Sequence, residues 1–163
     1  MSAYTQVEMH PTGNPMPDAP PIFTIGYEKR SIDDLIWVLL ARGVARVVDV
    51  RLTPASRRPD FSKKRLSSAL ESAGIAYEHR GALGNPPAIR ELYLAGNAEA
   101  GHKRFREHLE NGASAALDEL AMSLSDETVA LLCLERDPHR CHRSVVASIA
   151  AERLSGERAV VHL

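Results

Sequence analysis

Chemically reactive side chains gather in one stretch near the end of the chain. Residues 133–143 read Cys-Leu-Glu-Arg-Asp-Pro-His-Arg-Cys-His-Arg and include both cysteines of the protein. The segment leaves an apolar run at Cys133 and is expected to enter a helix near Arg140–His142. A thiol at a helix N-terminus beside cationic side chains has a lowered pKa, and the thiolate is its nucleophilic form. Cys141 is therefore a candidate nucleophile with His142 beside it, whereas Cys133 is expected to be a core thiol.

Other interpretations of this segment remain open. In cysteine phosphatases an arginine stands six positions after the nucleophile, but those positions here hold His139 and Ala147, so neither cysteine fits that loop. Zinc-ligand side chains are present, namely Cys133, His139, Cys141 and His142. Their spacing lacks the Cys-x2-Cys pairs typical of zinc sites, and we predict no metal site. Redox sensing by the two thiols requires their sulfur atoms to come within disulfide reach.

A basic stretch follows the second predicted strand. Residues 51–65 contain six cationic residues and one acidic residue. The cationic residues are Arg51, Arg57, Arg58, Lys63, Lys64 and Arg65. A basic loop at the end of a parallel strand suits phosphate or another polyanion. We expect Arg51, Arg57 and Arg143 to clamp an anion, with Ser56 as a neutral donor. The alternative is a solvated surface loop, and the single aromatic residue, Phe61, argues against single-stranded nucleic acid held by stacking.

Acid–base chemistry has two carboxylate candidates. Asp49 lies near the end of an apolar strand, where a cation, either Arg51 or Arg143, must compensate its burial. It is either catalytic or half of a structural Asp–Arg pair. Glu135 leaves another strand at the same expected edge, with His142 and His162 as neighbours. A carboxylate beside imidazole groups transfers protons, so Glu135 is the candidate general acid or base.

Alternating strands and helices must position these side chains. Short apolar runs predict strands at 22–25, 44–50, 75–79, 128–134 and 159–162. Helices are predicted between Ser31 and Gly43, between Ser62 and Gly74, over 88–124 in two or three pieces, and over 140–154. Ser31, with Asp34 three residues later, forms a weak version of a capping box. The alternation predicts a three-layer α/β domain with a mostly parallel sheet of about five strands and helices on both faces. Ligands bind such sheets beyond the carboxyl ends of the strands, where Tyr27 also falls.

Composition limits the class of protein. The chain has 163 residues, 44% of them hydrophobic, and a formal net charge of -1. We predict one α/β domain over residues 22–163, preceded by a flexible proline-rich tail at residues 1–21. The balanced charge provides no bulk attraction to nucleic acid or membranes. No apolar run approaches the roughly 20 residues that a membrane helix needs, and two cysteines without a secretory signal favour the cytoplasm.

Several short motifs together resemble a known family. They are Thr24-Ile25-Gly26-Tyr27, Val48-Asp49-Val50-Arg51, Leu132-Cys133 with Glu135, and Cys141-His142-Arg143. In this order, across residues 22–163, they are similar to the bacterial and archaeal family called domain of unknown function 488. The resemblance implies a small cytoplasmic α/β protein. It supports the fold and the choice of residues, and it implies no reaction.

The sequence therefore predicts an enzyme, a hydrolase or transferase acting on a phosphorylated or otherwise anionic ligand, with nucleotides and nucleic acids among the candidates. Catalytic roles are expected for Asp49, Glu135, Cys141 and His142. Ligand-binding roles are expected for Tyr27, Arg51, Ser56, Arg57, Arg143 and His162. The alternatives are a non-catalytic nucleotide- or nucleic-acid-binding module and a thiol redox sensor. The cofactor is unknown, and the oligomeric state is left open.

Overall fold

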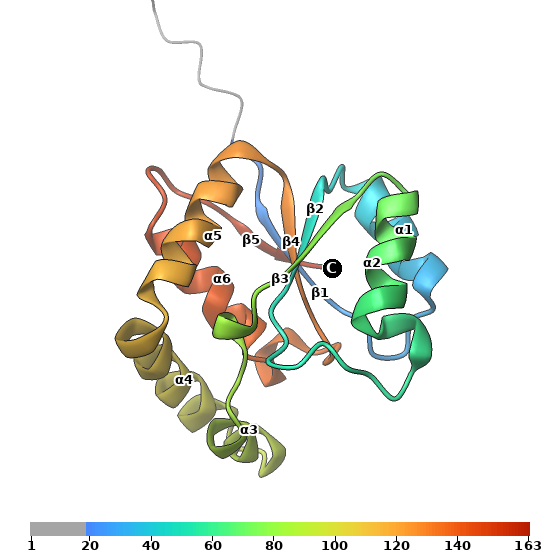
Figure 1. Cartoon of the computed structure of the whole chain (residues 1–163). Helices are drawn as coiled ribbons and strands as arrows, with labels where there is room; N and C mark the ends of the chain where they lie inside the picture. The colour runs from blue at the N-terminus through green and yellow to red at the C-terminus, as the bar shows by residue number, and fades with distance from the viewer. Residues whose placement is uncertain (1–18) are drawn as a thin grey trace, which may run out of the picture.

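The computed structural model describes residues 19–163, which form one five-stranded sheet with helices on both faces (Figure 1). All but the last three residues of the predicted tail lie outside the described part. The strands are β1 (Ile22–Gly26), β2 (Arg46–Asp49), β3 (Ala76–His79), β4 (Val129–Cys133) and β5 (Val160–His162). Every pair of neighbours is parallel. The predicted three-layer α/β fold is confirmed.

The sheet order is β3-β2-β4-β1-β5, so β4 lies at the centre. The chain runs outward through β2 and β3, and then returns to insert β4 between β1 and β2. In open parallel sheets, the point where the strand order reverses is where loops separate and a ligand can enter. Here the loops after β1, β2 and β4 meet at that point.

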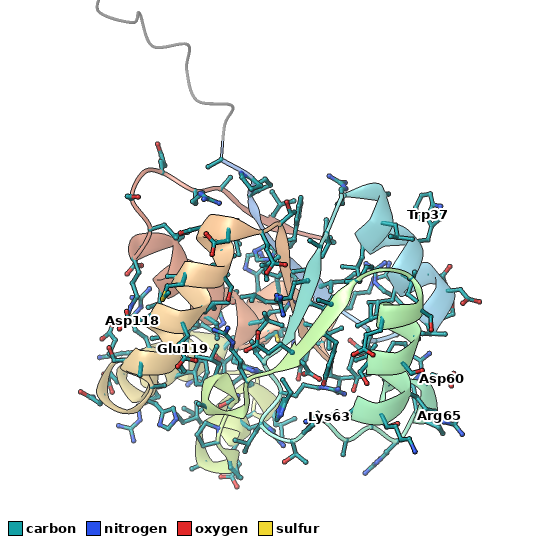
Figure 2. All side chains as sticks on the ribbon, turned by 45° about the horizontal axis from the view of Figure 1, so that its top comes forward. Trp37, Asp60, Lys63, Arg65, Asp118 and Glu119 are labelled. Atoms are coloured by element: carbon teal, nitrogen blue, oxygen red, sulfur yellow. The ribbon has the colours of Figure 1, made fainter. Side chains whose placement is uncertain are left out.

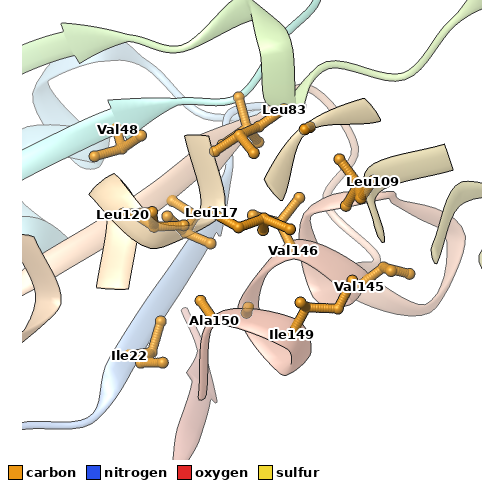
Figure 3. Packing of buried hydrophobic residues seen from close by; sticks show 14 of the residues in the cluster. Ile22, Val48, Leu83, Leu109, Leu117, Leu120, Val145, Val146, Ile149 and Ala150 are labelled. Atoms are coloured by element: carbon orange, nitrogen blue, oxygen red, sulfur yellow. The ribbon is translucent and has the colours of Figure 1, made fainter. Parts of the chain in front are cut away.

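Two hydrophobic clusters hold the layers together. One face of the sheet packs on α1 (Ile32–Ala41) and α2 (Lys63–Ser72). The other packs on α4 (Ala98–Gly112), α5 (Ser114–Asp126) and α6 (Arg143–Glu152), as Figure 3 shows for part of this cluster. A short helix, α3 (Pro87–Leu94), packs on α4. Because side chains alternate along a strand, Leu131 of β4 joins the second cluster and Leu132 the first.

Local sequence signals set most helix boundaries. At the start of α1 the Ser31 hydroxyl accepts from Asp34 N at 3.0 Å, while Asp34 Oδ2 accepts from Ser31 N at 3.3 Å, so the capping box is complete. Ser62 precedes α2 as predicted, but its hydroxyl donates to Pro59 O at 2.7 Å and caps no helical N–H group. The stretch 88–124 divides as expected near Gly96, which has a φ of 79°, and at Gly112.

Helix α6 begins later than predicted. Instead of entering at Arg140, the chain first makes a 3-10 turn, η3 (Pro138–Arg140), in which Asp137 Oδ1 accepts from His139 N at 2.9 Å. Cys141 then follows in extended conformation, and α6 starts only at Arg143. Cys141 therefore precedes the helix and does not lie within its first turn.

Within residues 19–163, none of the helices combines the length and the apolar character that crossing a membrane requires.

Candidate functional site

A pocket of about 370 Å³ opens where the loops after β1, β2 and β4 meet. The loop after β3 and helix α3 close it from the side. Among the predicted site residues, four line it, namely Tyr27, Arg51, Glu135 and His142. Asp49, Ser56, Arg57, Cys141, Arg143 and His162 are not among its lining residues. The expectation that residues after the strand ends converge thus holds for four of the ten predicted site residues.

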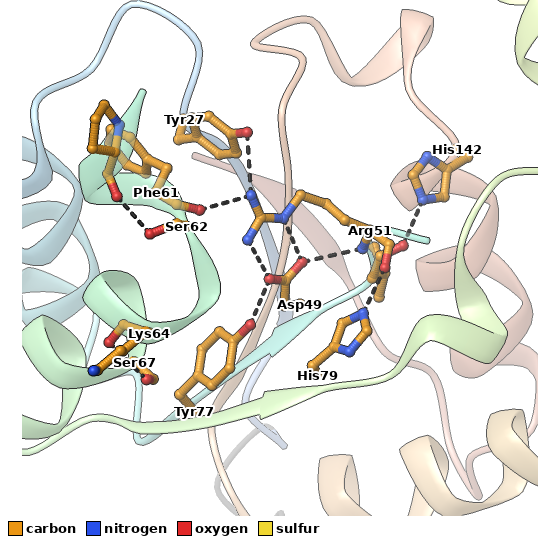
Figure 4. Close-up of polar contacts among 12 residues, drawn as sticks. Tyr27, Asp49, Arg51, Phe61, Ser62, Lys64, Ser67, Tyr77, His79 and His142 are labelled. Atoms are coloured by element: carbon orange, nitrogen blue, oxygen red, sulfur yellow. Dashed lines mark hydrogen bonds and ion pairs between the residues drawn. The ribbon is translucent and has the colours of Figure 1, made fainter. Parts of the chain in front are cut away.

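The Asp49–Arg51 pair forms the buried support of one wall (Figure 4). Arg51 Nε donates to Asp49 Oδ1 at 2.8 Å and its Nη2 to Oδ2 at 2.6 Å, a bidentate geometry. Its remaining nitrogen donates to Phe61 O and Tyr27 OH. Burial lowers the pKa of Arg51, but the Asp49 carboxylate outweighs burial and raises it above the usual value.

Both oxygens of the Asp49 carboxylate are therefore occupied by hydrogen bonds within the protein. Its side chain is fully buried, and the Tyr77 hydroxyl donates to Oδ2 at 2.7 Å beside the Arg51 bonds. Burial, followed by this contact with the carboxylate, raises the pKa of Tyr77. The geometry matches the structural Asp–Arg alternative and leaves no Asp49 oxygen facing the pocket.

Arg143 occupies a different place from the predicted anion clamp. Its side chain is fully buried, and it donates to Thr24 Oγ1 at 3.2 Å, to Glu135 O at 2.5 Å and to Arg136 O at 3.2 Å. These bonds tie the loop after β4 to β1. Of the three arginines expected to hold an anion, Arg51 alone lines the pocket, and its guanidinium is already bonded.

The basic stretch after β2 mostly faces solvent. Figure 2 shows Asp60, Lys63 and Arg65 at the surface around the start of α2, and Arg65 pairs with Asp60 at 3.5 Å. Arg57 is exposed, and Ser56 Oγ accepts from the backbone N–H of Arg58. This arrangement corresponds to the solvated-loop alternative.

His162 lies on the edge strand β5, where Nδ1 is 2.6 Å from Thr24 Oγ1. Burial, together with the nearby Arg143 guanidinium, lowers its pKa. Its bond partner is thus the same threonine hydroxyl that accepts from Arg143. His162 extends this structural network and does not reach the pocket lining.

At the floor of the pocket, the Cys133 thiol, the His142 imidazole and the Glu135 carboxylate lie close together, with the Cys141 thiol behind them. Cys133 Sγ donates to Glu135 Oε2 at 3.3 Å and lies 3.7 Å from His142 Nδ1, while Cys141 Sγ lies 4.0 Å from the same nitrogen. His142 Nε2 is 2.8 Å from Val50 O. Because a carbonyl only accepts, Nε2 carries a proton, and in the neutral form of His142 the Nδ1 lone pair faces the sulfurs.

The Cys141 thiol is not activated in the predicted way. It is 1% exposed, and burial raises its pKa well above the usual value, opposite to the expected direction. The reason is its position before α6, in the core, where a thiolate is poorly solvated. The thiol that lines the pocket is Cys133.

The thiols also affect the acid and the imidazole. Burial raises the pKa of Glu135, but hydrogen bonds from the thiols and the nearby His142 outweigh burial and leave it below its usual value. Burial lowers the pKa of His142, and contacts with Cys141, Val50 O and Glu135 reverse that effect. Glu135 is therefore a carboxylate at neutral pH.

Sequence reasoning missed two buried pocket residues. Asn85 and Tyr93 are 4% and 7% exposed, and both line the pocket. Asn85 Oδ1 and Tyr93 OH have no hydrogen-bond partner within the described part of the chain. Burial raises the pKa of Tyr93. The only sequence signal was the irregular Gly84-Asn85-Pro86-Pro87 loop, because neither residue lies at a strand end.

Arg90 and Arg140 were also missed, and both line the pocket. Arg90 donates to Asn85 O at 3.2 Å. Arg90 lies on α3 and Arg140 in the turn before α6, so strand periodicity gave no reason to select them.

One glycine at the base of the site has no room for a side chain. A Cβ atom on Gly26 would lie 1.8 Å from the Glu135 carbonyl oxygen. This is the carbonyl to which Arg143 donates. The end of β1 can therefore pass against the Glu135 backbone only as glycine.

The fold defines a three-layer α/β protein with a pocket at the carboxyl ends of its central strands. The model of the family described as Domain of unknown function DUF488 matches residues 31–150. The chain belongs to this family, as its sequence motifs indicated. Comparisons with curated proteins and with solved structures found no match.

Proposed function

We propose that the protein is an enzyme, a hydrolase or transferase, that acts on a small anionic ligand bound in this pocket. The observation that carries the proposal is the pair of unpartnered polar atoms, Asn85 Oδ1 and Tyr93 OH, in a pocket that also contains Glu135. A buried polar atom without a partner costs about 1–3 kcal/mol. Both atoms are shielded from solvent, so a ligand removes that cost only if it reaches them when nearby side chains move.

Beside its three acidic residues, Glu28, Glu135 and Asp137, the pocket lining holds arginines and apolar side chains that suit a ligand with an anionic group and an apolar part. Arg90 and Arg140 supply guanidinium groups suited to phosphate or carboxylate. Leu52 and Leu94 supply apolar surface suited to a ring such as a nucleobase. A volume of 370 Å³ accommodates a small molecule, so a nucleotide-sized compound is the favoured class.

Glu135 is the group placed for proton transfer. It lines the pocket as a carboxylate and accepts from the Cys133 thiol. In this role it takes a proton from water or from a substrate hydroxyl as that oxygen attacks the electrophilic atom. The bond from that atom to the leaving group breaks, and the proton passes from Glu135 to the leaving group. His142 positions the cluster, because its Nε2 is held by Val50 O. The buried Cys141 is not assigned the role of nucleophile.

The test is turnover of defined probes by the full chain. The probes are p-nitrophenyl phosphate, bis(p-nitrophenyl) phosphate, ATP and a short RNA, with released p-nitrophenol, phosphate or nucleotides as readout. Glu135→Gln should lower turnover about 10²-fold or more, as expected for loss of a general base. Glu157→Gln, at an exposed position in the loop before β5, is the matched control and should leave turnover unchanged.

Equal turnover in the Glu135→Gln variant would contradict the assignment of the base. Binding of ATP or RNA without any turnover would favour the non-catalytic module instead. In that case a steep loss of affinity with added salt would indicate contacts to many backbone phosphates.

A further inference from the structure

We propose that Cys133, Cys141 and His142 form a binding site for one zinc ion at the floor of the pocket. The two Sγ atoms and one imidazole nitrogen all lie within 4.8 Å of one another, and all three residues are buried. The spacing rule for paired cysteines did not predict this site, because its ligands come from the end of β4 and from the turn before α6. The proposal stands independently of the proposed function.

The separations fit tetrahedral coordination. Zinc–sulfur bonds of about 2.3 Å and zinc–nitrogen bonds of about 2.0–2.1 Å imply ligand–ligand edges of about 3.5–3.8 Å. The two sulfur–nitrogen separations are 3.7 and 4.0 Å. Small side-chain movements are therefore enough to close the three ligands around one ion.

His142 is already oriented as a metal ligand. Its Nε2–H group donates to Val50 O at 2.8 Å, which leaves the Nδ1 lone pair facing both sulfurs. The Phe105 ring lies edge-on to the imidazole, with centroids 5.2 Å apart, and restricts its rotation. Ligating histidines commonly have the opposite ring nitrogen held in this way by a carbonyl or carboxylate.

Charge favours a divalent ion with affinity for sulfur. Each cysteine releases its proton on binding, so two protons leave as one Zn²⁺ enters, and the buried site stays neutral. Two thiolates without a cation would be poorly solvated at this depth, since both cysteines are at most 4% exposed. Thiolate and imidazole ligands select zinc over magnesium or calcium, which prefer oxygen.

The fourth coordination position faces the pocket. Cys133 and His142 line the pocket, whereas Cys141 lies behind them in the core. Three protein ligands and one open position are typical of catalytic zinc sites. Glu135 Oε2 lies 3.3 Å from Cys133 Sγ, next to that position, and we assign it a place beside the ion and not on it.

The test uses untagged full-length protein, reduced, stripped of metal with a chelator and titrated with zinc sulfate. Bound metal is measured after gel filtration, and zinc affinity by competition with a chromophoric chelator. The expected stoichiometry is one zinc per chain. Cobalt(II) in place of zinc should give the near-ultraviolet charge-transfer band of a thiolate ligand.

Variants separate the ligands from their neighbours. Cys133→Ser, Cys141→Ser and His142→Gln should each weaken zinc binding about 100-fold or more. His139→Gln is the matched control, because His139 is exposed in the same segment and does not belong to the three-residue cluster. It should retain one zinc with unchanged affinity.

Two outcomes would overturn the proposal. One is reduced wild-type protein that binds no zinc and shows no thiolate–cobalt band, a result that does not depend on any variant folding. The other is zinc retained by both cysteine variants. A Cys133–Cys141 disulfide in air, with no zinc bound after reduction, would assign the pair to redox chemistry. Because zinc is measured without substrate, failure of this proposal and failure of the proposed enzyme are distinguishable.

Discussion

At the scale of single residues, an arginine plays a different part at the surface and in the interior of this protein. Arg57 and Arg143 both belong to the predicted anion clamp. Arg57 is exposed, whereas Arg143 is fully buried and donates to two carbonyl oxygens and one hydroxyl. The buried Arg143 guanidinium holds the loop that carries Glu135. We therefore expect its removal to lower the free energy of unfolding more than it lowers the affinity for a ligand.

Replacing Arg143 tests this role. Arg143→Ala should lower the free energy of unfolding by about 3 kcal/mol, because buried acceptors lose charge-assisted bonds. Arg143→Lys should recover only part of the loss, since one ammonium group cannot reproduce the planar fork of donors. Arg57→Ala, the exposed control, should change stability by less than about 0.5 kcal/mol. Urea denaturation measures all three, and equal effects of the two alanine variants would remove Arg143 from the structural role.

At the scale of elements, the site depends on where β1 ends and how its neighbours approach it. The backbone at Gly26 touches the Glu135 carbonyl, and the loop after β4 is fixed there. Tyr27 and Glu28, in the loop between β1 and α1, form the first wall of the pocket.

Gly26→Ala should separate these two segments. The added methyl group would overlap Glu135 O, so we expect a loss of about 1–3 kcal/mol or more from overpacking, together with reduced activity wherever turnover is found. Gly112→Ala is the matched control, because nothing lies within 4 Å of its added Cβ atom. Thermal unfolding of both variants measures the difference. A Gly26→Ala variant as stable as the control would contradict the close approach.

The two serines before helices provide a test of capping. Ser31→Ala removes the hydroxyl that accepts from Asp34 N and should cost about 1 kcal/mol. Ser62→Ala should cost less, because the Ser62 hydroxyl caps no helical N–H group. The free energy of unfolding from urea titration measures each loss. The reverse order of the two effects would show that the capping box contributes little here.

At the scale of the whole molecule, one central strand joins both cores. Adjacent residues of β4 point to opposite faces, Leu131 toward α4–α6 and Leu132 toward α1 and α2, and both are fully buried. The same strand ends at Cys133 beneath the pocket. Packing on either face therefore supports the position of the site.

Truncation of either leucine should destabilise the whole molecule. Leu131→Ala and Leu132→Ala should each lower the free energy of unfolding by about 2–5 kcal/mol. Both variants should unfold in one transition, because the two clusters share the sheet. Calorimetry checks this by comparing the calorimetric and van't Hoff enthalpies. Two separate transitions in either variant would show that the layers fold independently. The exposed Met122→Ala, on α5, is the surface control.

The sequence alone determined the succession of strands and helices and the edge at which polar residues follow them. Apolar runs and helical spacing depend on neighbouring residues only, so β1 to β5 and the capping box of α1 were predictable. The rule for parallel sheets predicted that Tyr27, Arg51 and Glu135 lie at one edge of the sheet, and all three line the pocket there. A buried carboxylate needs a cation, so the sequence also suggested that Asp49 pairs with Arg51 or Arg143, and the structure selects Arg51.

Only the tertiary structure decided which side chains meet and which polar atoms stay free. It buried Cys141 beside Cys133 and His142, left His139 exposed, and turned Arg143 toward backbone carbonyls. It also brought Asn85 and Tyr93 from outside the strand ends into the pocket. The physical reason is that strand order, helix start and side-chain direction are set by packing between distant segments, which local periodicity does not record.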